Sequence, residues 1–370
     1  LFVSTANGVT HTVAGALART NLGIFRIDGT GVTINGGDNS GAATAQSRIT
    51  ATTVSVGASV TVAGVRQFTA GMVNNGVVNL GLATVAGDAT SGMISVGTSV
   101  NAYSQASTLN LTANVTIAGP VVHSDGDINL GPWNLTVTGP TYTRAAVATA
   151  VYTAAPTTVT NGFLIWAGVI TFDFNGGKIP RIESSGVGTV TVISNAEVTD
   201  YYWNFGPFAP SISAGVVLSI SGGTWLEDVG GVGTPAVVGA GSVAVTGPAT
   251  TLIMSVAPGV TVPNLIVATT SATFTIGGTA TPRTLVVLTL LTHTSGTIAL
   301  GFNDIAFTNA GNAYTYVAGN VTGTTSTSLL GSIGEFVFGT AGQTLTLTNS
   351  GLGIPHARVV AGSRGCLCGR

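Results

Sequence analysis

The sequence predicts an all-β fold, a right-handed parallel β-helix (β-solenoid), and three observations support it. Apolar and small polar residues alternate in short segments such as Val54–Gly57 and Asn114–Gly119, which is the period of a β-strand. These segments end in glycine, which supplies the positive φ of a tight corner. Glycines at 64, 81, 97, 119 and 139 close such segments at intervals of 16 to 22 residues, about one coil of two or three short strands. Tandem β-sandwich domains are the alternative fold, but no clear linker divides the chain.

In chain order, the first forty residues, ending near Gly41, are expected to form the first coils. The pattern is clearest between residues 54 and 139 and returns after residue 215. β-Branched residues dominate it and fit a pleated surface, whereas strong helix formers such as Glu, Lys and Met are scarce. The segments with the strongest alternation are Val54–Gly57, Ser59–Gly64, Leu109–Thr112, Asn114–Gly119, Asp127–Gly131, Asn134–Gly139, Val217–Gly222, Val243–Gly247, Thr273–Gly277 and Thr344–Gly351.

We expect a single domain over residues 1–370. Residues 143–215 interrupt the regular pattern and contain a cluster of aromatic residues, so a longer loop excursion from the coils is expected there. Residues 354–370 are predicted to form a flexible tail that contains Cys366 and Cys368. The tail cysteines are unremarkable thiols, link copies by intermolecular disulfides, or bind a metal ion; the sequence leaves these three interpretations open. Two cysteines are too few for a closed zinc site.

Charge is the most unusual feature of the composition. Asp, Glu, Lys and Arg make up 6% of the chain, against roughly 25% in an ordinary soluble domain. In a solenoid, equivalent outward residues lie ~4.8 Å apart on neighbouring coils, where like charges repel. Few charges also mean little repulsion between copies, which favours self-association. A net charge of −2 gives no footprint for nucleic acid, and no apolar run reaches the ~18 residues of a membrane helix.

Units such as Leu109–Gly119, Ile128–Gly139 and Thr344–Gly351 resemble the repeats of bacterial and archaeal surface β-solenoids, of the filamentous-haemagglutinin-like or envelope-fibre type. The resemblance covers most of the chain in style. It implies an exported structural or adhesive protein at the cell surface, and it carries over no functional residue. The hexapeptide repeat of left-handed β-helices is absent, which favours the right-handed form.

Two groups of charged residues are candidate sites. Asp125 and Asp127 beside His123 suggest either a weak calcium site or a turn, and the turn is favoured because Asp and Gly are turn residues. The segment from Asp173 to Glu183, which includes Lys178 and Arg181, suggests a surface salt-bridge cluster on a loop, or a polysaccharide lyase site. No catalytic, metal-binding or phosphate-binding motif is present. We therefore expect a protein that is not an enzyme and that needs no cofactor.

Aromatic residues and sequons supply the remaining candidate contacts. An aromatic run could stack on glycans or on a partner, or form a small local core; its members are Tyr201, Tyr202, Trp203 and Phe205. Asn-x-Thr sequons at outward positions could carry glycans; they begin at Asn110, Asn114, Asn134 and Asn320.

These observations predict a structural subunit of an extracellular filament, sheath or surface layer. It would self-assemble through its solenoid ends and low-charge faces, with copies of itself as the main partner and glycans or envelope components as further partners. The alternatives are an adhesin or glycan-binding spike and a β-helix polysaccharide lyase or hydrolase. Threonine pairs such as Thr136 and Thr138 also raise ice binding, but their irregular spacing argues against it.

Overall fold

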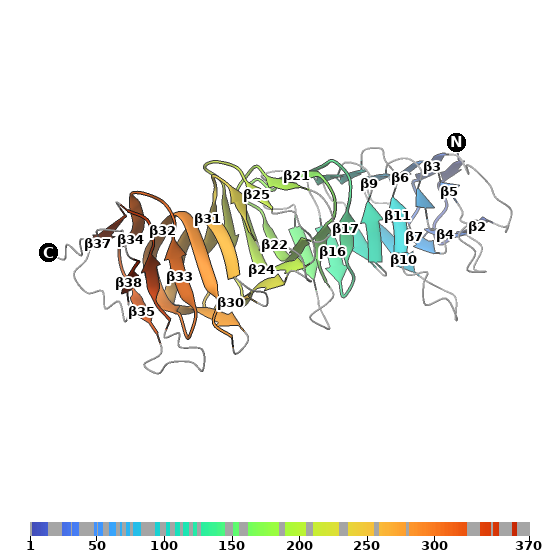
Figure 1. The fold of residues 1–370 in the computed structure, drawn as a ribbon. Helices are drawn as coiled ribbons and strands as arrows, with labels where there is room; N and C mark the ends of the chain where they lie inside the picture. Colours follow the sequence, from blue (N-terminus) through green and yellow to red (C-terminus); the bar gives the residue numbers. More distant parts are fainter. Residues whose placement is uncertain are drawn as a thin grey trace. The chain divides into compact units, whose positions relative to one another are not determined.

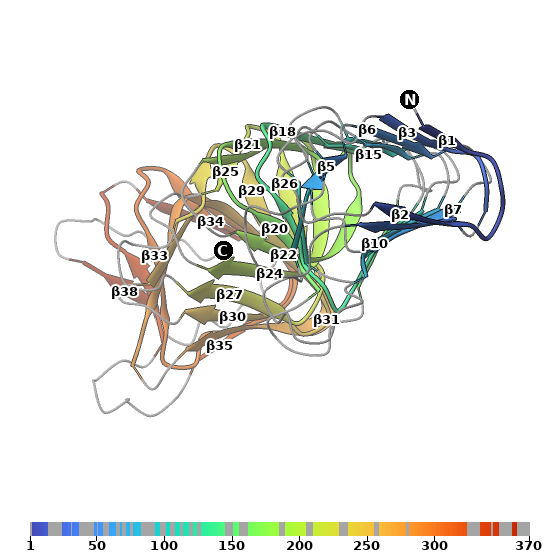
Figure 2. The same ribbon diagram turned by 90° about the vertical axis from the view of Figure 1, so that its right-hand side faces the viewer.

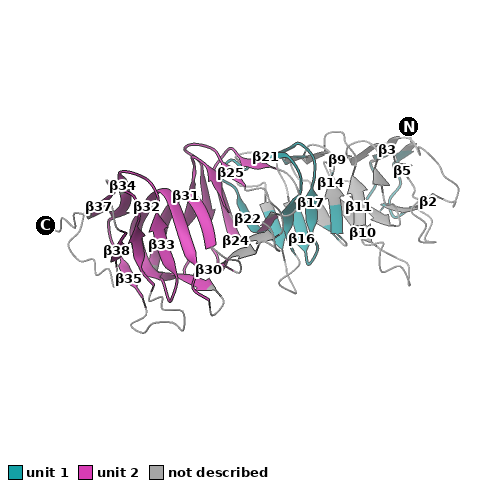
Figure 3. Cartoon of the chain, in the orientation of Figure 1, with its two compact units in different colours: residues 1–181 teal, residues 182–370 magenta. Residues whose placement is uncertain are grey.

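The structure is a computed structural model. The chain divides into two compact units, Leu1–Arg181 and Ile182–Arg370 (Figure 3), and each is described by itself. The single domain predicted from the sequence stays a prediction. The residues described are 2–13, 24–30, 32–36, 48–49, 51–54, 59–63, 67–68, 72–74, 77–82, 93–96, 101–103, 108–111, 114–117, 121–123, 127–144, 151–154, 162–184, 189–204, 210–228, 236–254, 259–278, 281–323, 334–341, 343–347 and 357–360.

Unit 1 consists of three stacks of short parallel strands. The first stack is β1 (Phe2–Ser4), β3 (Ile24–Ile27), β6 (Ala51–Val54), β9 (Met72–Asn74), β12 (Asn101–Tyr103), β15 (Val121–His123), β18 (Thr141–Arg144) and β21 (Ile170–Asp173). The second is β2 (Thr10–Val13), β4 (Val32–Gly36), β7 (Ser59–Ala63), β10 (Val77–Leu82), β13 (Thr108–Leu111), β16 (Asp127–Gly131) and β19 (Val151–Ala154). The third is β5 (Arg48–Ile49), β8 (Gln67–Phe68), β11 (Met93–Val96), β14 (Asn114–Ile117), β17 (Leu135–Val137) and β20 (Leu164–Trp166). Consecutive strands of one stack belong to successive coils.

Unit 2 also stacks parallel strands, and these range from 2 to 20 residues in length. The boundary between the units falls inside β22 (Lys178–Ser184). Its next strands are β23 (Val190–Val192), β24 (Ala196–Asn204), β25 (Ser211–Ile212), β26 (Val217–Ile220), β27 (Thr224–Asp228), β28 (Val238–Gly239), β29 (Ser242–Val245) and β30 (Thr251–Met254). Figure 2 shows β24, β27 and β30 side by side, as their parallel pairing requires.

The remaining strands form the C-terminal coils of unit 2. They are β31 (Gly259–Gly278), β32 (Thr284–Ala299), β33 (Asp304–Phe307), β34 (Asn312–Tyr316), β35 (Asn320–Thr322), β36 (Phe336–Phe338), β37 (Thr344–Leu347) and β38 (Ala357–Val359). Strand β32 pairs along its length with β31 (Figure 1). On its other side it pairs in turn with β33, β34 and β35, which are the three faces of the next coil. Successive coils lie about 24 residues apart. The predicted β-solenoid is therefore confirmed, while its right-handed sense stays a prediction.

Apolar columns fill the interior of the coils. In unit 2 one column passes from strand to strand in register through Leu218, Val243, Leu265, Leu291 and Tyr314, and all five side chains are buried. Burial alternates with exposure along strands such as β26 and β33, as the period-two pattern predicts. Each buried aliphatic side chain contributes roughly 1.5–3 kcal/mol relative to exposure, so the columns supply stability that ion pairs do not.

Neutral polar side chains join one coil to the next at the corners. The Oδ1 atom of Asn114 accepts a hydrogen bond from the backbone N–H of Asn134, at 3.0 Å, and Asn134 accepts one from the N–H of Phe163, at 3.0 Å. In unit 2, Asn195 accepts from the N–H of Val217 at 2.9 Å. These bonds satisfy backbone N–H groups at the corners that the strand ladders do not pair. The accepting side chains are uncharged.

Hydroxyl groups make the complementary contact where strands end. They donate to a backbone carbonyl of the preceding coil, so these threonine and serine side chains help to hold successive coils together. The bonds are Thr138 to Ile117, Ser221 to Val198, Thr246 to Ile220, Thr250 to Gly222, Thr294 to Val267 and Thr340 to Thr308. Asn, Thr and Ser thus make many of the polar contacts between coils without a charge, while Asp200 and Asp304 accept backbone hydrogen bonds in the same way.

The expected loop excursion over residues 143–215 is wrong for the part that the structure describes. That part contains seven strands, from β19 to β25. The pattern was obscured because several inward positions carry large rings in place of Val or Ile. Trp166, Phe172 and Phe174 are buried and stacked, with the ring centroids of Trp166 and Phe172 4.5 Å apart. The flexible tail is likewise wrong for residues 357–359, which form β38 in register with β36.

Candidate functional site

The aromatic run predicted as a contact surface does not present all its rings to solvent. Tyr201 is 1% exposed, and it pairs in register with the buried Trp225 on the next coil. For Tyr201, the burial favours the local core over the contact surface, the two alternatives that the sequence left open. Strand β24 bends at a corner near Asp200. The bend changes which residues face the interior, so that Tyr201 faces inward. Tyr202 and Trp203 belong to the same strand, but their side chains and the whole of Phe205 lie outside the described residues.

The charged segment from Asp173 to Glu183 is a strand–turn–strand, and the expected loop is wrong. Asp173 ends β21, and Lys178, Arg181 and Glu183 lie on β22. Arg181 is 5% exposed, and its guanidinium carbon lies 4.2 Å from the centroid of the Phe163 ring. This cation–π contact with a buried ring explains why the guanidinium lies inward. Lys178 alone of the three on β22 is fully exposed.

Of the three residues considered as a calcium site, His123 alone has a described side chain. His123 is fully buried, edge-on to Tyr152 with 5.3 Å between ring centroids. Asp127 begins β16, and Asp125 lies outside the described residues. Within the described part of the chain, no three His, Cys, Asp or Glu side chains gather as a metal site would require.

The asparagines of the sequons differ in how exposed they are. Asn114 and Asn320 are exposed, and Asn134 is half-buried. Asn110 lies on β13, with its side chain outside the description. The Oδ1 atoms of Asn114 and Asn134 already bond to neighbouring coils, a role that the sequon pattern does not reveal. Cys366 and Cys368 lie outside the described residues.

A second buried histidine, which the sequence shows only as an isolated residue, organises a corner of unit 2. The Nε2–H of His293 donates to the carbonyl of Gly296 at 3.1 Å, so its Nδ1 accepts from the hydroxyl of Tyr314 at 3.0 Å. Burial lowers the pKa of His293 below its usual value, although hydrogen bonds to the backbone of Gly296 and Ser295 oppose this. Burial and the neighbouring Tyr316 raise the pKa of Tyr314. The side chains of His293 and Tyr314 are fully buried, so this cluster acts on the fold and not on a dissolved substrate.

The last coil of unit 2 has a strand edge that no described strand covers. Strand β38 pairs with β36 on one side, and no other described strand pairs with it. All three of its residues are exposed, and Val359 and Val360 are 43% and 41% exposed. Strand β36, one coil earlier, has the alternating burial of an inner strand.

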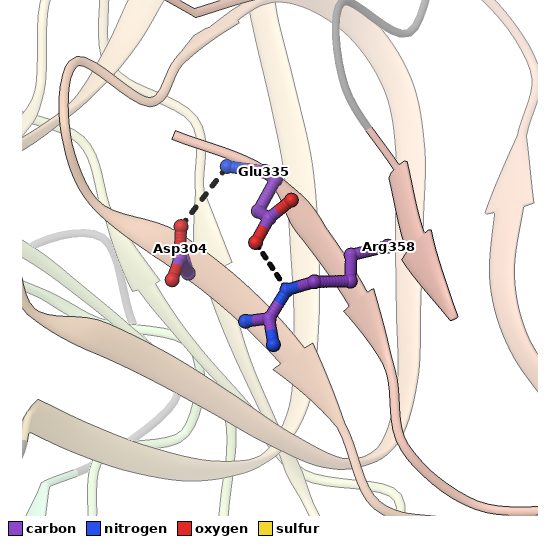
Figure 4. A network of polar contacts seen from close by, with 3 residues as sticks. All are labelled: Asp304, Glu335 and Arg358. Atoms are coloured by element: carbon purple, nitrogen blue, oxygen red, sulfur yellow. Dashed lines mark hydrogen bonds and ion pairs between the residues drawn. The ribbon is translucent and has the colours of Figure 1, made fainter. Parts of the chain in front are cut away.

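A polar network holds this last strand in place (Figure 4). The backbone N–H of Glu335 donates to Asp304 at 3.0 Å, and the Arg358 guanidinium pairs with the Glu335 carboxylate. The three residues belong to three successive coils. The network therefore fixes β38 against β36 and leaves its outer edge uncovered by the described chain.

No helix in the described part of the chain is long and apolar enough to cross a membrane. A scan against models of known protein families, a search of curated proteins and a search of solved structures each returned no match.

Proposed function

We propose that this protein is a non-enzymatic structural subunit of an extracellular filament, sheath or surface layer, whose main partner is another copy of itself. The observation that carries the proposal is the exposed edge of β38. Its backbone groups and apolar side chains offer the next coil the same surface that each inner strand offers its neighbour.

Two further properties support association between copies. A chain with 6% charged residues has little electrostatic repulsion between its faces. Many corner contacts between coils use neutral Asn, Thr and Ser side chains. The charged Glu335 and Arg358 at the last coil pair with each other, so a second copy can meet this surface without burying an unpaired charge. Addition of a strand to an open sheet edge is a common mode of recognition.

Electron microscopy of the purified native protein, across a range of pH and salt, tests the proposal. We expect linear or layered assemblies. Dispersed single molecules under every condition would contradict it.

A further inference from the structure

We propose that a hollow on unit 2 binds an uncharged oligosaccharide. The hollow has a volume of about 440 Å³, within the range of ligand sites. The side chains of Thr270, Ser295, Thr297 and Asn320 surround it, with Gly296 and Gly319 between them. They come from β31, β32 and the start of β35, which are three successive coils. We call this site the glycine hollow; it is separate from the β38 edge, and it adds a binding activity to the proposed structural role.

Two glycines stacked on each other, Gly296 and Gly319, line the hollow. A Cβ on Gly319, at φ +118°, would lie 2.1 Å from the carbonyl oxygen of Gly296 and 2.5 Å from Nε2 of His293. A Cβ on Gly296, at φ +85°, would lie 1.8 Å from the hydroxyl of Thr269. These three contacts are far inside van der Waals distance, so the preceding coil packs directly against both glycines. A side chain at either position would distort this part of the lining.

Buried hydrogen bonds hold the floor of the glycine hollow rigid. The carbonyl of Gly296 accepts from His293 at 3.1 Å, and the carbonyl of Gly319 accepts from the Tyr316 hydroxyl at 2.7 Å. Both donors belong to largely buried rings. A site that is already ordered loses less entropy when a ligand binds.

Among the described residues, the polar side chains of the lining are not used to join one coil to the next. Elsewhere in unit 2, hydroxyls such as those of Thr246 and Thr294 bond to the preceding coil. Within the described part of the chain, the side chains of Thr270, Ser295, Thr297 and Asn320 make no such bond. Thr297 and Asn320 are register partners, so these groups lie on adjacent strands ~4.8 Å apart. Their donors and acceptors remain available to a ligand.

The same lining selects the class of ligand. Its described residues include no Lys or Arg that would pair with an acidic sugar, and no carboxylate. Among the same residues, Ala318 is the one apolar side chain, which gives a peptide no pocket for its side chains. A neutral chain of hydroxyl groups, each able to donate and accept, matches the hydroxyl and amide lining best.

Frontal affinity chromatography on the immobilised full-length protein tests this site. The protein is produced in a bacterial host without N-glycosylation, so that Asn320 carries no sugar of its own. The probes are cellohexaose, maltohexaose, mannohexaose and chitohexaose, with hexagalacturonate and a Gly/Ser hexapeptide as comparison ligands. We expect retention of at least one neutral hexasaccharide and of neither comparison ligand.

Variants then assign the binding to the glycine hollow. Thr297→Val and Asn320→Ala each remove hydrogen-bonding groups and should weaken binding roughly three- to tenfold. Ala318→Trp fills the hollow and should abolish binding. Thr322→Val, on the same strand as Asn320 and exposed outside the hollow, is the matched control and should bind like the wild type. An unchanged thermal unfolding midpoint shows that each variant is folded.

Three results would overturn the inference: no retention of any neutral hexasaccharide, undiminished retention by Ala318→Trp, or retention of the hexapeptide or hexagalacturonate alone. Failure here leaves the proposed assembly untouched, because microscopy of the wild-type protein reports on assembly by itself.

Discussion

Strands β31 and β38, both in unit 2, differ in whether one or both of their edges pair with another described strand. Strand β31 pairs with β29 and β30 on one side and with β32 on the other, and its inward residues Leu265 and Phe274 are fully buried. Strand β38 pairs with β36 alone among the described strands, and its residues are all exposed. The difference shows that one coil cannot bury its own residues: a solenoid strand needs a neighbour on both sides. We infer that assembly supplies the second neighbour of β38.

Disruption of the open edge should have the largest effect. Val359→Lys places a charge where a second copy would bury an apolar side chain, and charged residues at sheet edges block pairing. We expect assembly to be lost, with the concentration needed for assembly raised by more than roughly tenfold. Sedimentation velocity over a concentration series measures this.

The matched control is Val169→Lys, because Val169 is a 73% exposed valine at a turn. It should assemble like the wild type. Equal assembly by Val359→Lys and Val169→Lys would show that β38 is not the contact surface.

Damage to an inner coil should instead destabilise the fold. Leu265→Ala removes a fully buried side chain from the apolar column and should lower the free energy of unfolding by about 2–5 kcal/mol. Leu288→Ala is the control, since Leu288 is 41% exposed on the neighbouring strand β32, and it should change stability by less than about 0.5 kcal/mol. Denaturant unfolding followed by tryptophan fluorescence compares them. Similar losses would mean that the column does not carry the stability of the coils.

Acid should weaken the coils that surround His293. Its pKa is lowered by burial in the folded state, so the unfolded state binds the proton more readily. This stability is complete above the usual histidine pKa near ~6.5 and is lost as pH falls through the folded pKa. The loss is at most about 1.4 kcal/mol for each pH unit.

The variant His293→Gln keeps a polar side chain but does not titrate. Unfolding free energies measured between neutral pH and pH 5 should fall less steeply for this variant than for the wild type. Parallel pH profiles for the two proteins would refute the role given to His293.

Removal of one corner contact should have the smallest effect. Asn195→Ala deletes the acceptor for the N–H of Val217 and should cost about 1 kcal/mol. Asn195→Asp keeps an accepting oxygen and should retain most of the stability. Thermal unfolding of the two variants distinguishes them, and equal midpoints would show that the hydrogen bond contributes nothing.

The period-two pattern and glycine spacing were enough to predict the β-solenoid, because both report local backbone geometry. Segments such as Asn134–Gly139 coincide with strands, here β17. The pattern failed where aromatic residues such as Trp166 and Phe172 took inward positions, since ring size hides the alternation. It also left the environment of Tyr201 open, because a corner inside β24 changes which residues face inward.

The candidate sites were harder to predict than the fold. The glycine hollow joins residues such as Thr270, Ser295 and Asn320 from three coils, and only the stacking register brings them together. The same is true of the corner contacts of Asn114 and Asn195. In the sequence these residues are isolated asparagines, and their one visible signal is a position at the start of a strand, as for Asn114, or just before one, as for Asn195.

Hydrogen exchange at the two outward amides of β38 tests the central claim most directly. Val360 donates its N–H to Phe338, so in a parallel ladder the alternate N–H groups of Ala357 and Val359 point away from β36. We predict that these two amides exchange freely in dilute protein and become protected, like those of β36, at concentrations where assemblies form. Exchange that stays fast and independent of protein concentration would contradict the account.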